Sequence, residues 1–238
     1  MADIIYTGTA DGHVQNTQFA TTPWSDVRAM ASGTVAETDT VILIYNNSYD
    51  LVRRAADQYT CHRILIPFNT GAVLPAGAAI VGATLTLEND NQINAGTNSF
   101  VYVTQGAQPD ETTLTTGDYS AYEDALDSPE EGGSRLDVST DGTKVSAFNA
   151  TGKRWIKKAG EASAGGGSAG WTKILLRGYY DVEDIAPLDG TSEFSGRFSS
   201  SEGANSPSFT VTWNPPPLPA VKLKGSQMRL KGSKVLIK

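Results

Sequence analysis

Apolar and polar positions alternate most regularly between Arg63 and Leu87, where the pattern predicts two strands joined by a turn. A short apolar run, Ile64–Phe68, is followed by Asn, Gly and Pro residues within Asn69–Ala78, which favour a tight connection. From Ile80 to Leu87 apolar residues then alternate with Gly and Thr, as in a strand with one buried face. That face would hold Val81, Ala83, Leu85 and Leu87. The segment therefore predicts antiparallel pairing.

Short apolar runs separated by Gly, Asn, Asp and Ser recur along the chain, and long helical periodicity is absent. Asp118–Leu126 suits a short helix, and the glycine-rich stretch Gly160–Gly170 suits a flexible surface loop. These patterns predict an all-β, antiparallel sandwich. The further strands are expected at Ile4–Tyr6, Val41–Tyr45, Asp50–Val52, Phe100–Thr104, Val145–Phe148, Trp171–Leu176 and Phe209–Trp213.

Prolines end the sandwich pattern. Four of the six residues in Asn214–Pro219 are proline, which cannot pair inside a sheet and favours an extended spacer. The expected organisation is a sandwich at 1–213, made of lead-in strands (1–60) and a module core (60–213). A spacer at 214–220 and a tail at 221–238 follow it.

The tail is a basic near-repeat with a period of seven, VKLKGSQ, MRLKGSK and VLIK. Apolar residues alternate with Lys or Arg, and Gly-Ser supplies turns, which is a strand-turn-strand pattern too narrow to be stable alone. The tail is therefore expected to anchor the chain to a partner or to its own copies, or else to fold back on the body. The anchor residues are Val221, Lys222, Leu223, Lys224, Met228, Arg229, Leu230, Lys231, Lys234, Val235, Ile237 and Lys238.

Charge divides the chain in two. Removing the six positive charges of the tail from the net charge of −7 leaves −13 on the rest. An acidic surface repels phosphates, so nucleic acid is not expected to bind the body. No apolar run is long enough to span a bilayer, so membrane insertion is not expected. The first residues lack the features of a secretory signal, which predicts that the protein stays in the cytoplasm or leaves in a particle released by lysis.

One cysteine, Cys61, excludes a disulfide framework within the chain and is expected to be a small buried residue, with a reactive thiol as the alternative. His62 would lie on the opposite face of the same strand. With two histidines and no phosphate-binding loop, zinc, triad and nucleotide chemistry are not expected. No pair of carboxylates stands out for glycoside hydrolysis. The chain therefore predicts no enzyme and no catalytic residue.

Several motifs together resemble the jelly-roll module often called the DNRLRE domain, which is related to a family of carbohydrate-binding modules. The motifs that carry the resemblance are Arg63, Phe68, Asn69-Thr70-Gly71, Leu74-Pro75-Ala76-Gly77, Ile80, Ala83, Leu85, Leu87, Ser201-Glu202-Gly203, Asn205-Ser206-Pro207 and Phe209–Trp213. The segment Trp24–Arg28 also looks like tailed-phage members of this group. The resemblance implies a jelly-roll sandwich from bacterial surfaces or phage virions, and it carries no catalytic residue.

Acidic residues after the Tyr179-Tyr180 pair are the candidate metal ligands. Carboxylate oxygens gathered on a loop suit Ca²⁺, and jelly-roll modules often hold a structural calcium. The alternative is a solvated acidic loop. The candidate calcium ligands are Asp181, Glu183, Asp184 and Asp189.

Exposed aromatic rings on one sandwich face would stack on a sugar. The candidate carbohydrate-binding residues are Trp24, Tyr119, Tyr122, Trp155, Tyr179 and Tyr180, whereas Trp171 and Trp213 lie in strand patterns and are expected in the core. A packing role is the alternative for each ring.

The sequence as a whole predicts a non-enzymatic structural protein of a tailed-phage virion, of the capsid-decoration or fibre type. Its partners would be other virion proteins, copies of itself and weakly bound glycans. The alternative is an extracellular, soluble carbohydrate-binding module.

Overall fold

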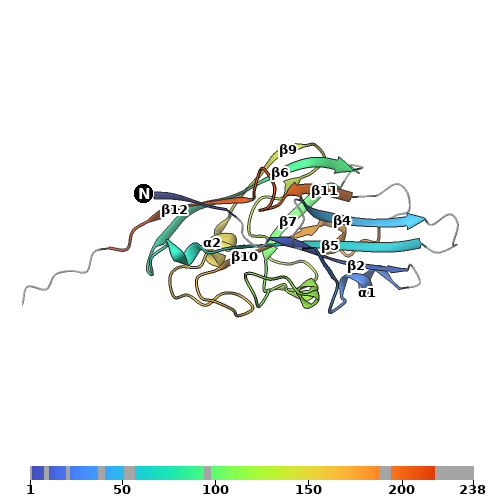
Figure 1. Ribbon diagram of the computed structural model, residues 1–238, viewed down its shortest axis with the longest axis horizontal. Helices are drawn as coiled ribbons and strands as arrows, with labels where there is room; N and C mark the ends of the chain where they lie inside the picture. Colours follow the sequence, from blue (N-terminus) through green and yellow to red (C-terminus); the bar gives the residue numbers. More distant parts are fainter. Residues whose placement is uncertain are drawn as a thin grey trace, which may run out of the picture.

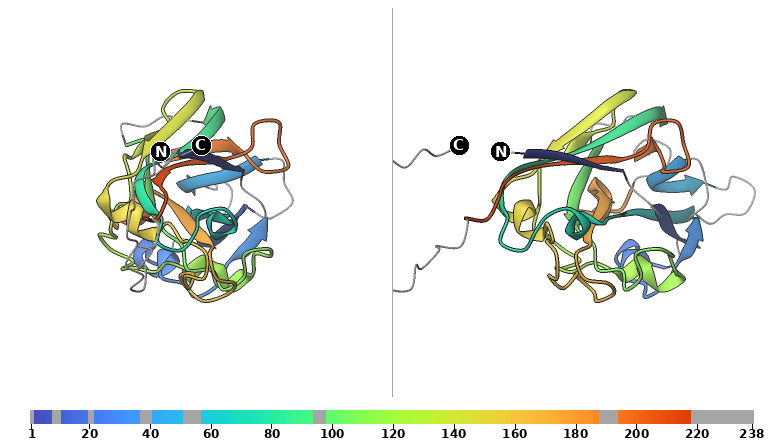
Figure 2. Two further views of the ribbon diagram at one scale, coloured as in Figure 1. Left: turned by 90° about the vertical axis from the view of Figure 1, so that its left-hand side faces the viewer. Right: turned by 60° about the vertical axis from the view of Figure 1, so that its left-hand side comes forward.

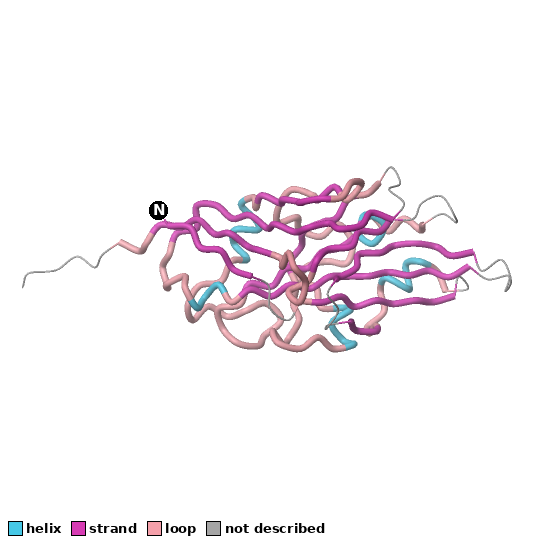
Figure 3. Tube along the Cα trace, turned by 45° about the horizontal axis from the view of Figure 1, so that its top comes forward, coloured by secondary structure: helices cyan, strands magenta, loops and turns pink. Residues whose placement is uncertain are grey.

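The computed structural model describes residues 2–7, 11–19, 22–36, 41–50, 57–93, 98–187 and 194–217. Strands account for most of the regular structure in these residues, and the helices are short (Figure 3). The strands are β1 (Ala2–Thr7), β2 (Gly12–Phe19), β3 (Thr34–Ala36), β4 (Val41–Asp50), β5 (Asp57–Phe68), β6 (Ala79–Ile93), β7 (Phe100–Gln105), β8 (Leu136–Asp137), β9 (Gly142–Ala147), β10 (Thr172–Gly178), β11 (Phe194–Ser199) and β12 (Ser208–Asn214). The helices are α1 (Trp24–Arg28), α2 (Ala150–Trp155) and α3 (Tyr179–Val182), with 3-10 turns η1 (Thr70–Ala72) and η2 (Thr116–Ser120).

The strands pair in antiparallel fashion in the order β1-β12-β6-β11-β4-β5-β10-β7-β8, and β2, β3 and β9 join at the sides. They run along the length of an elongated body (Figure 1). The chain is thus the all-β, antiparallel sandwich that the alternation predicts. The jelly-roll connection order stays a prediction.

The two strands predicted around the turn Asn69–Ala78 are confirmed as β5 and β6. Ala83, Leu85 and Leu87 are buried on one face of β6, as expected. Val81 is 40% exposed instead, because the register with β12 shifts between Thr212 and Trp213 and leaves Val81 opposite the irregularity.

The expected lead-in strands belong to the same sheet as the module core. β1 pairs with β12, β2 with β5, and β4 with β11, so residue 60 does not mark a structural boundary. Strands β2, β3, β8 and β11 were not predicted. The short helix expected at Asp118–Leu126 is instead the 3-10 turn Thr116–Ser120, and Leu51-Val52 lies outside the described residues.

Both ends of the body's chain lie at one end of the molecule. β1 and β12 run side by side there, and the described chain passes from β12 into the proline spacer (Figures 1 and 2). β1 stands at one end of the strand order, so among the described strands its outer edge has no partner. Pro216 lies against the turn at Gly77, where an added Cβ would be 3.4 Å from the proline Cβ. No described helix is long and apolar enough to cross a membrane.

Candidate functional sites

Asp181, a predicted calcium ligand, is fully buried and held by arginines. Arg63 donates from Nε to Oδ2 at 2.9 Å and from Nη2 to Oδ1 at 2.8 Å. Arg177 donates from Nε to Oδ2 at 2.9 Å and from Nη2 to Oδ1 at 3.0 Å. The three side chains come from α3, β5 and β10, so one carboxylate ties these elements together in the interior.

A third buried arginine, Arg28 of α1, completes this arginine cluster. Its Nε lies 3.6 Å from Asp181 Oδ1, and its Nη1 reaches Asp127 at 2.7 Å and Asp184 at 2.9 Å. Asp127 and Asp184 are 69% and 44% exposed, so they bring the outer carboxylates to the cluster from the surface. Three arginines thus face three carboxylates, and the charges balance.

Charge pairing sets the protonation of the cluster. Burial alone would raise the pKa of Asp181, but the charges of Arg177 and Arg63 outweigh it and hold that pKa well below its usual range. Burial alone would lower the pKa of Arg63, and the charge of Asp181 outweighs it in the same way and raises that pKa. Asp181 and Arg63 therefore stay charged at neutral pH.

This geometry does not fit the predicted calcium site. Asp181 is ion-paired with arginines, and Asp184 is ion-paired with Arg28. Glu183 accepts a hydrogen bond from the Tyr102 hydroxyl. A cation would meet guanidinium groups there, which repel it. Asp189 lies outside the described residues, and no group of three or more His, Cys, Asp and Glu side chains in the described part of the chain is placed to hold a metal ion.

Cys61 is buried beside the cluster, as predicted. Burial raises the pKa of its thiol to about 12, so the thiol is protonated and unreactive at neutral pH. His62 points the other way on β5 and stacks on His13 of β2, with ring centroids 5.1 Å apart. Both imidazoles are buried.

Four of the six predicted carbohydrate-binding aromatics are buried. The prediction that they form an exposed platform for a sugar is therefore wrong for these four. Trp24 donates from Nε1 to the Tyr180 carbonyl at 3.1 Å, and the Tyr119 hydroxyl donates to the Val27 carbonyl at 3.0 Å. Trp155 packs edge-on against Phe148. Their rings fill the core because it offers both apolar contact and a polar partner. The buried four are Trp24, Tyr119, Trp155 and Tyr180.

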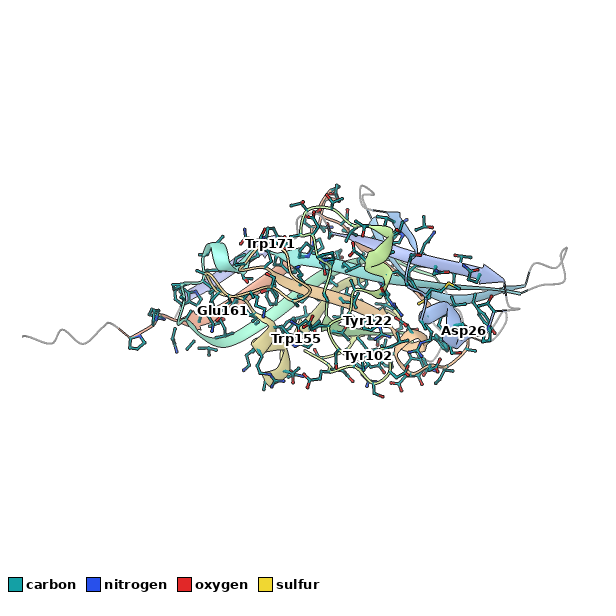
Figure 4. All side chains as sticks on the ribbon, turned by 90° about the horizontal axis from the view of Figure 1, so that it is seen from below. Asp26, Tyr102, Tyr122, Trp155, Glu161 and Trp171 are labelled. Atoms are coloured by element: carbon teal, nitrogen blue, oxygen red, sulfur yellow. The ribbon has the colours of Figure 1, made fainter. Side chains whose placement is uncertain are left out.

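The remaining two aromatics, Tyr122 and Tyr179, are half-buried. Tyr122 lies near the middle of the body beside Tyr102, whereas Trp155 lies nearer the spacer end (Figure 4). Only these two of the six candidate rings are therefore partly accessible to a sugar. Trp171 and Trp213, expected in the core, are also half-buried.

Sequence reasoning missed the role of Lys173, which fixes the glycine-rich stretch Gly160–Gly170 in place. Its buried ammonium donates to the carbonyls of Gln108, Ala164 (3.0 Å) and Gly166 (2.9 Å), and lies 3.1 Å from Glu111 Oε1. This stretch is therefore an ordered loop and not the expected flexible one. The sequence does contain a signal for this role, because Lys173 interrupts the apolar strand pattern of 171–176.

A polar groove of about 300 Å³ lies between β2 and β3, lined by Gln15, Asn16, Thr17, Gln18, Ser32, Gly33 and Thr34. Asn16 Nδ2 donates to the Ser32 carbonyl at 2.7 Å, and Gln18 Nε2 donates to Asn16 Oδ1 at 3.0 Å. These bonds hold the amide side chains in one arrangement. Amides and hydroxyls so fixed can hydrogen-bond the hydroxyls of a neutral sugar.

The predicted anchor residues of 221–238 lie outside the described residues. Comparison of the chain with models of known protein families and with curated proteins finds no match. The resemblance to the DNRLRE-type module stays a prediction.

Proposed function

We propose that this chain is a non-enzymatic structural protein of a tailed-phage virion, of the capsid-decoration or fibre type. The observation that carries the proposal is the division of one chain into a folded body of charge −13, a proline spacer and a basic repeat of six positive charges. In this proposal the body projects outward and the tail attaches it to other virion proteins or to sister copies. The resemblance to tailed-phage members of the DNRLRE group also supports it.

Attachment works by strand addition and charge complementarity. The alternating residues of the tail join a sheet edge of another molecule, and their Lys and Arg side chains meet acidic neighbours. The outer edge of β1 supports this mechanism, since it is unpaired among the described strands and carries the acidic residue Asp3. Many copies on one particle make weak attachments effective together.

Light scattering of the full chain beside a chain ending at Pro217 tests the proposal. Self-association of the full chain, and a monomeric mass for the shorter one, would support an assembly tail. Monomers in both cases would remove self-association from the proposal. Incorporation of the full chain, but not the shorter one, into particles then decides the attachment to other virion proteins.

The second candidate function is a soluble carbohydrate-binding module, favoured by the polar groove between β2 and β3. Binding of a neutral glycan would then be weakened by Gln15→Ala and unaffected by ending the chain at Pro217. A glycan array with both variants separates the two functions, because only the first requires the tail.

A further inference from the structure

A second groove, of about 500 Å³, lies between the start of β6 and the segment that follows α2. We name it the basic groove. Its lining combines small apolar residues with charged ones. The lining residues are Ala78, Ala79, Ile80, Ala150, Lys153, Arg154, Ile156, Lys158 and Glu161.

The groove reverses the charge of the surrounding body. Three cations, Lys153, Arg154 and Lys158, line it against the single carboxylate of Glu161. Within the part of the chain that the structure describes, the Lys153 ammonium hydrogen-bonds to the Val81 carbonyl alone, at 3.3 Å. Arg154 and Lys158 pair at 3.3 and 3.2 Å with exposed glutamates, and exposed pairs contribute little and exchange partners readily. An incoming carboxylate therefore meets Lys153, which hydrogen-bonds a carbonyl, and two cations whose exposed glutamate partners it can replace.

The support beneath these cations is rigid. The Asn149 side chain caps α2 by accepting from the Gly152 amide at 3.0 Å, and Trp155 and Ile156 are buried. Trp155 lies so close over Gly132 that a Cβ there would be 1.9 Å from the ring. Because the backbone is fixed within the basic run, Lys153–Lys158, the charges of this run project from a surface formed before any partner arrives.

The basic groove lies beside the root of the tail. Ala78 and Ala79, which line it, directly follow Gly77, the residue that Pro216 contacts. Glu161 lies toward the same end of the body, opposite to Asp26 (Figure 4). A partner that holds the tail therefore comes within reach of the groove.

We propose that the basic groove docks an acidic polypeptide segment of the protein to which the tail attaches, an inference that rests on the function proposed above. The small alanine side chains that line the groove let an extended chain approach closely. The carboxylates of that chain pair with Lys153, Arg154 and Lys158. A long polyanion such as nucleic acid would extend beyond the groove over a body of charge −13, which repels it. A short acidic segment meets only the groove.

Fluorescence anisotropy with a short, labelled oligo-L-glutamate tests the proposal on the full chain. The groove variant is Lys153→Glu with Lys158→Glu, and the charge-matched control is Lys144→Glu with Arg135→Glu, two cations of the body that do not line the groove. A tail variant, Lys222→Glu with Lys224→Glu, measures separately the oligo-L-glutamate that the tail binds. Far-UV circular dichroism checks that each variant is folded. The groove variant should bind at least about tenfold more weakly than the wild type, and the control variant should stay within about twofold of it.

Equal weakening in the groove variant and the control variant would overturn the groove site, because net charge alone would then explain binding. Equal binding by the groove variant and the wild type would overturn it as well. A labelled heparin oligosaccharide or single-stranded DNA that binds the groove more tightly than oligo-L-glutamate would overturn the polypeptide as its ligand. Light scattering of the same samples is a separate readout. Loss of self-association in the tail variant alone reports on the tail's assembly role, whatever the groove binds.

Discussion

Arg63 and Asp181 lie 118 positions apart in the chain and form a two-pronged ion pair in the interior, with N–O distances of 2.9 and 2.8 Å. Arg63 also donates to the carbonyls of Tyr119 (2.5 Å) and Arg28 (2.7 Å). One guanidinium from β5 thus hydrogen-bonds to groups of α1, α3 and η2. A buried charge is tolerated only when it is so fully paired.

Replacing Asp181 by Asn should lower the free energy of unfolding by about 3–5 kcal/mol, because it leaves buried arginines without their shared carboxylate. Urea unfolding followed by tryptophan fluorescence measures the change. The matched control is Glu123→Gln, which removes one exposed carboxylate and should have almost no effect. Equal stability of wild type and Asp181→Asn would contradict the structural role of the cluster.

Acid should remove the stability that the ion pairs of Asp181 contribute to the folded protein. Because the pKa of Asp181 is lowered in the folded state, its contribution is fully present above the unfolded pKa of about 4 and is lost as the pH falls below that value. Wild-type stability should therefore fall more steeply below pH 4 than that of Asp181→Asn. Parallel curves would show that other carboxylates govern acid unfolding.

Cys61 should resist thiol reagents in the folded protein at pH 8, since it is buried and the pKa of its thiol is raised to about 12. Reaction with a chromogenic disulfide should reach one thiol per chain only in denaturant. Full reaction of the native protein within the mixing time would show that the thiol is accessible.

Alkali should destabilise the wild type through this thiol. Above pH 8.5 the unfolded thiol loses its proton while the folded one keeps it, which lowers the free energy of unfolding by about 1.4 kcal/mol at pH 9.5. Urea unfolding between pH 7 and 9.5 should show this slope in the wild type and not in Cys61→Ala.

How much of this architecture the sequence predicts depends on what is buried. β6 shows its period because Ala83, Leu85 and Leu87 are apolar and inward. β2 hides its period because His13 and Asn16 are buried and polar, with the Asn16 amide bonded to the Ser32 carbonyl. Alternation of hydrophobicity cannot identify an inward position whose polar atoms are satisfied by hydrogen bonds.

The arginine cluster escaped prediction for a related reason. Asp181 is a candidate calcium ligand in the sequence because acidic residues follow it closely. Its partners in the structure are Arg177, four residues earlier, and Arg63, 118 residues away. The sequence does contain a signal for the cluster, because Arg63 and Arg177 each lie inside an apolar strand. An arginine at an inward position requires a carboxylate, but sequence alone does not say which one.

Adding a methyl group at Gly132 should destabilise the body by about 1–3 kcal/mol, because the new Cβ would overlap the Trp155 ring. Thermal or urea unfolding of Gly132→Ala measures the loss. Gly117→Ala is the control, since its Cβ would lie 3.7 Å from the nearest atom, an ordinary contact. If the two variants are equally stable, Trp155 does not pack as described.

Lys173→Met should release the glycine-rich loop, because three carbonyls and the Glu111 carboxylate lose their shared ammonium. Breaking such a buried pair costs about 3–5 kcal/mol. Hydrogen exchange of the amides in 160–170 should become faster in this variant than in Lys157→Met, which removes a half-buried lysine of the basic run. Unchanged exchange in Lys173→Met would mean that the glycines hold the loop without the lysine.

The pairing of β1 with β12 has a consequence for synthesis on the ribosome. The first strand to emerge must wait for the last one, roughly 200 residues later, which at typical elongation rates takes about 10–40 s. During that time Ile5 and the unpaired backbone of β1 are available to other nascent chains. Slower initiation or chaperone supply should therefore raise the soluble yield of this protein, because the body can close only after β12 has been synthesised.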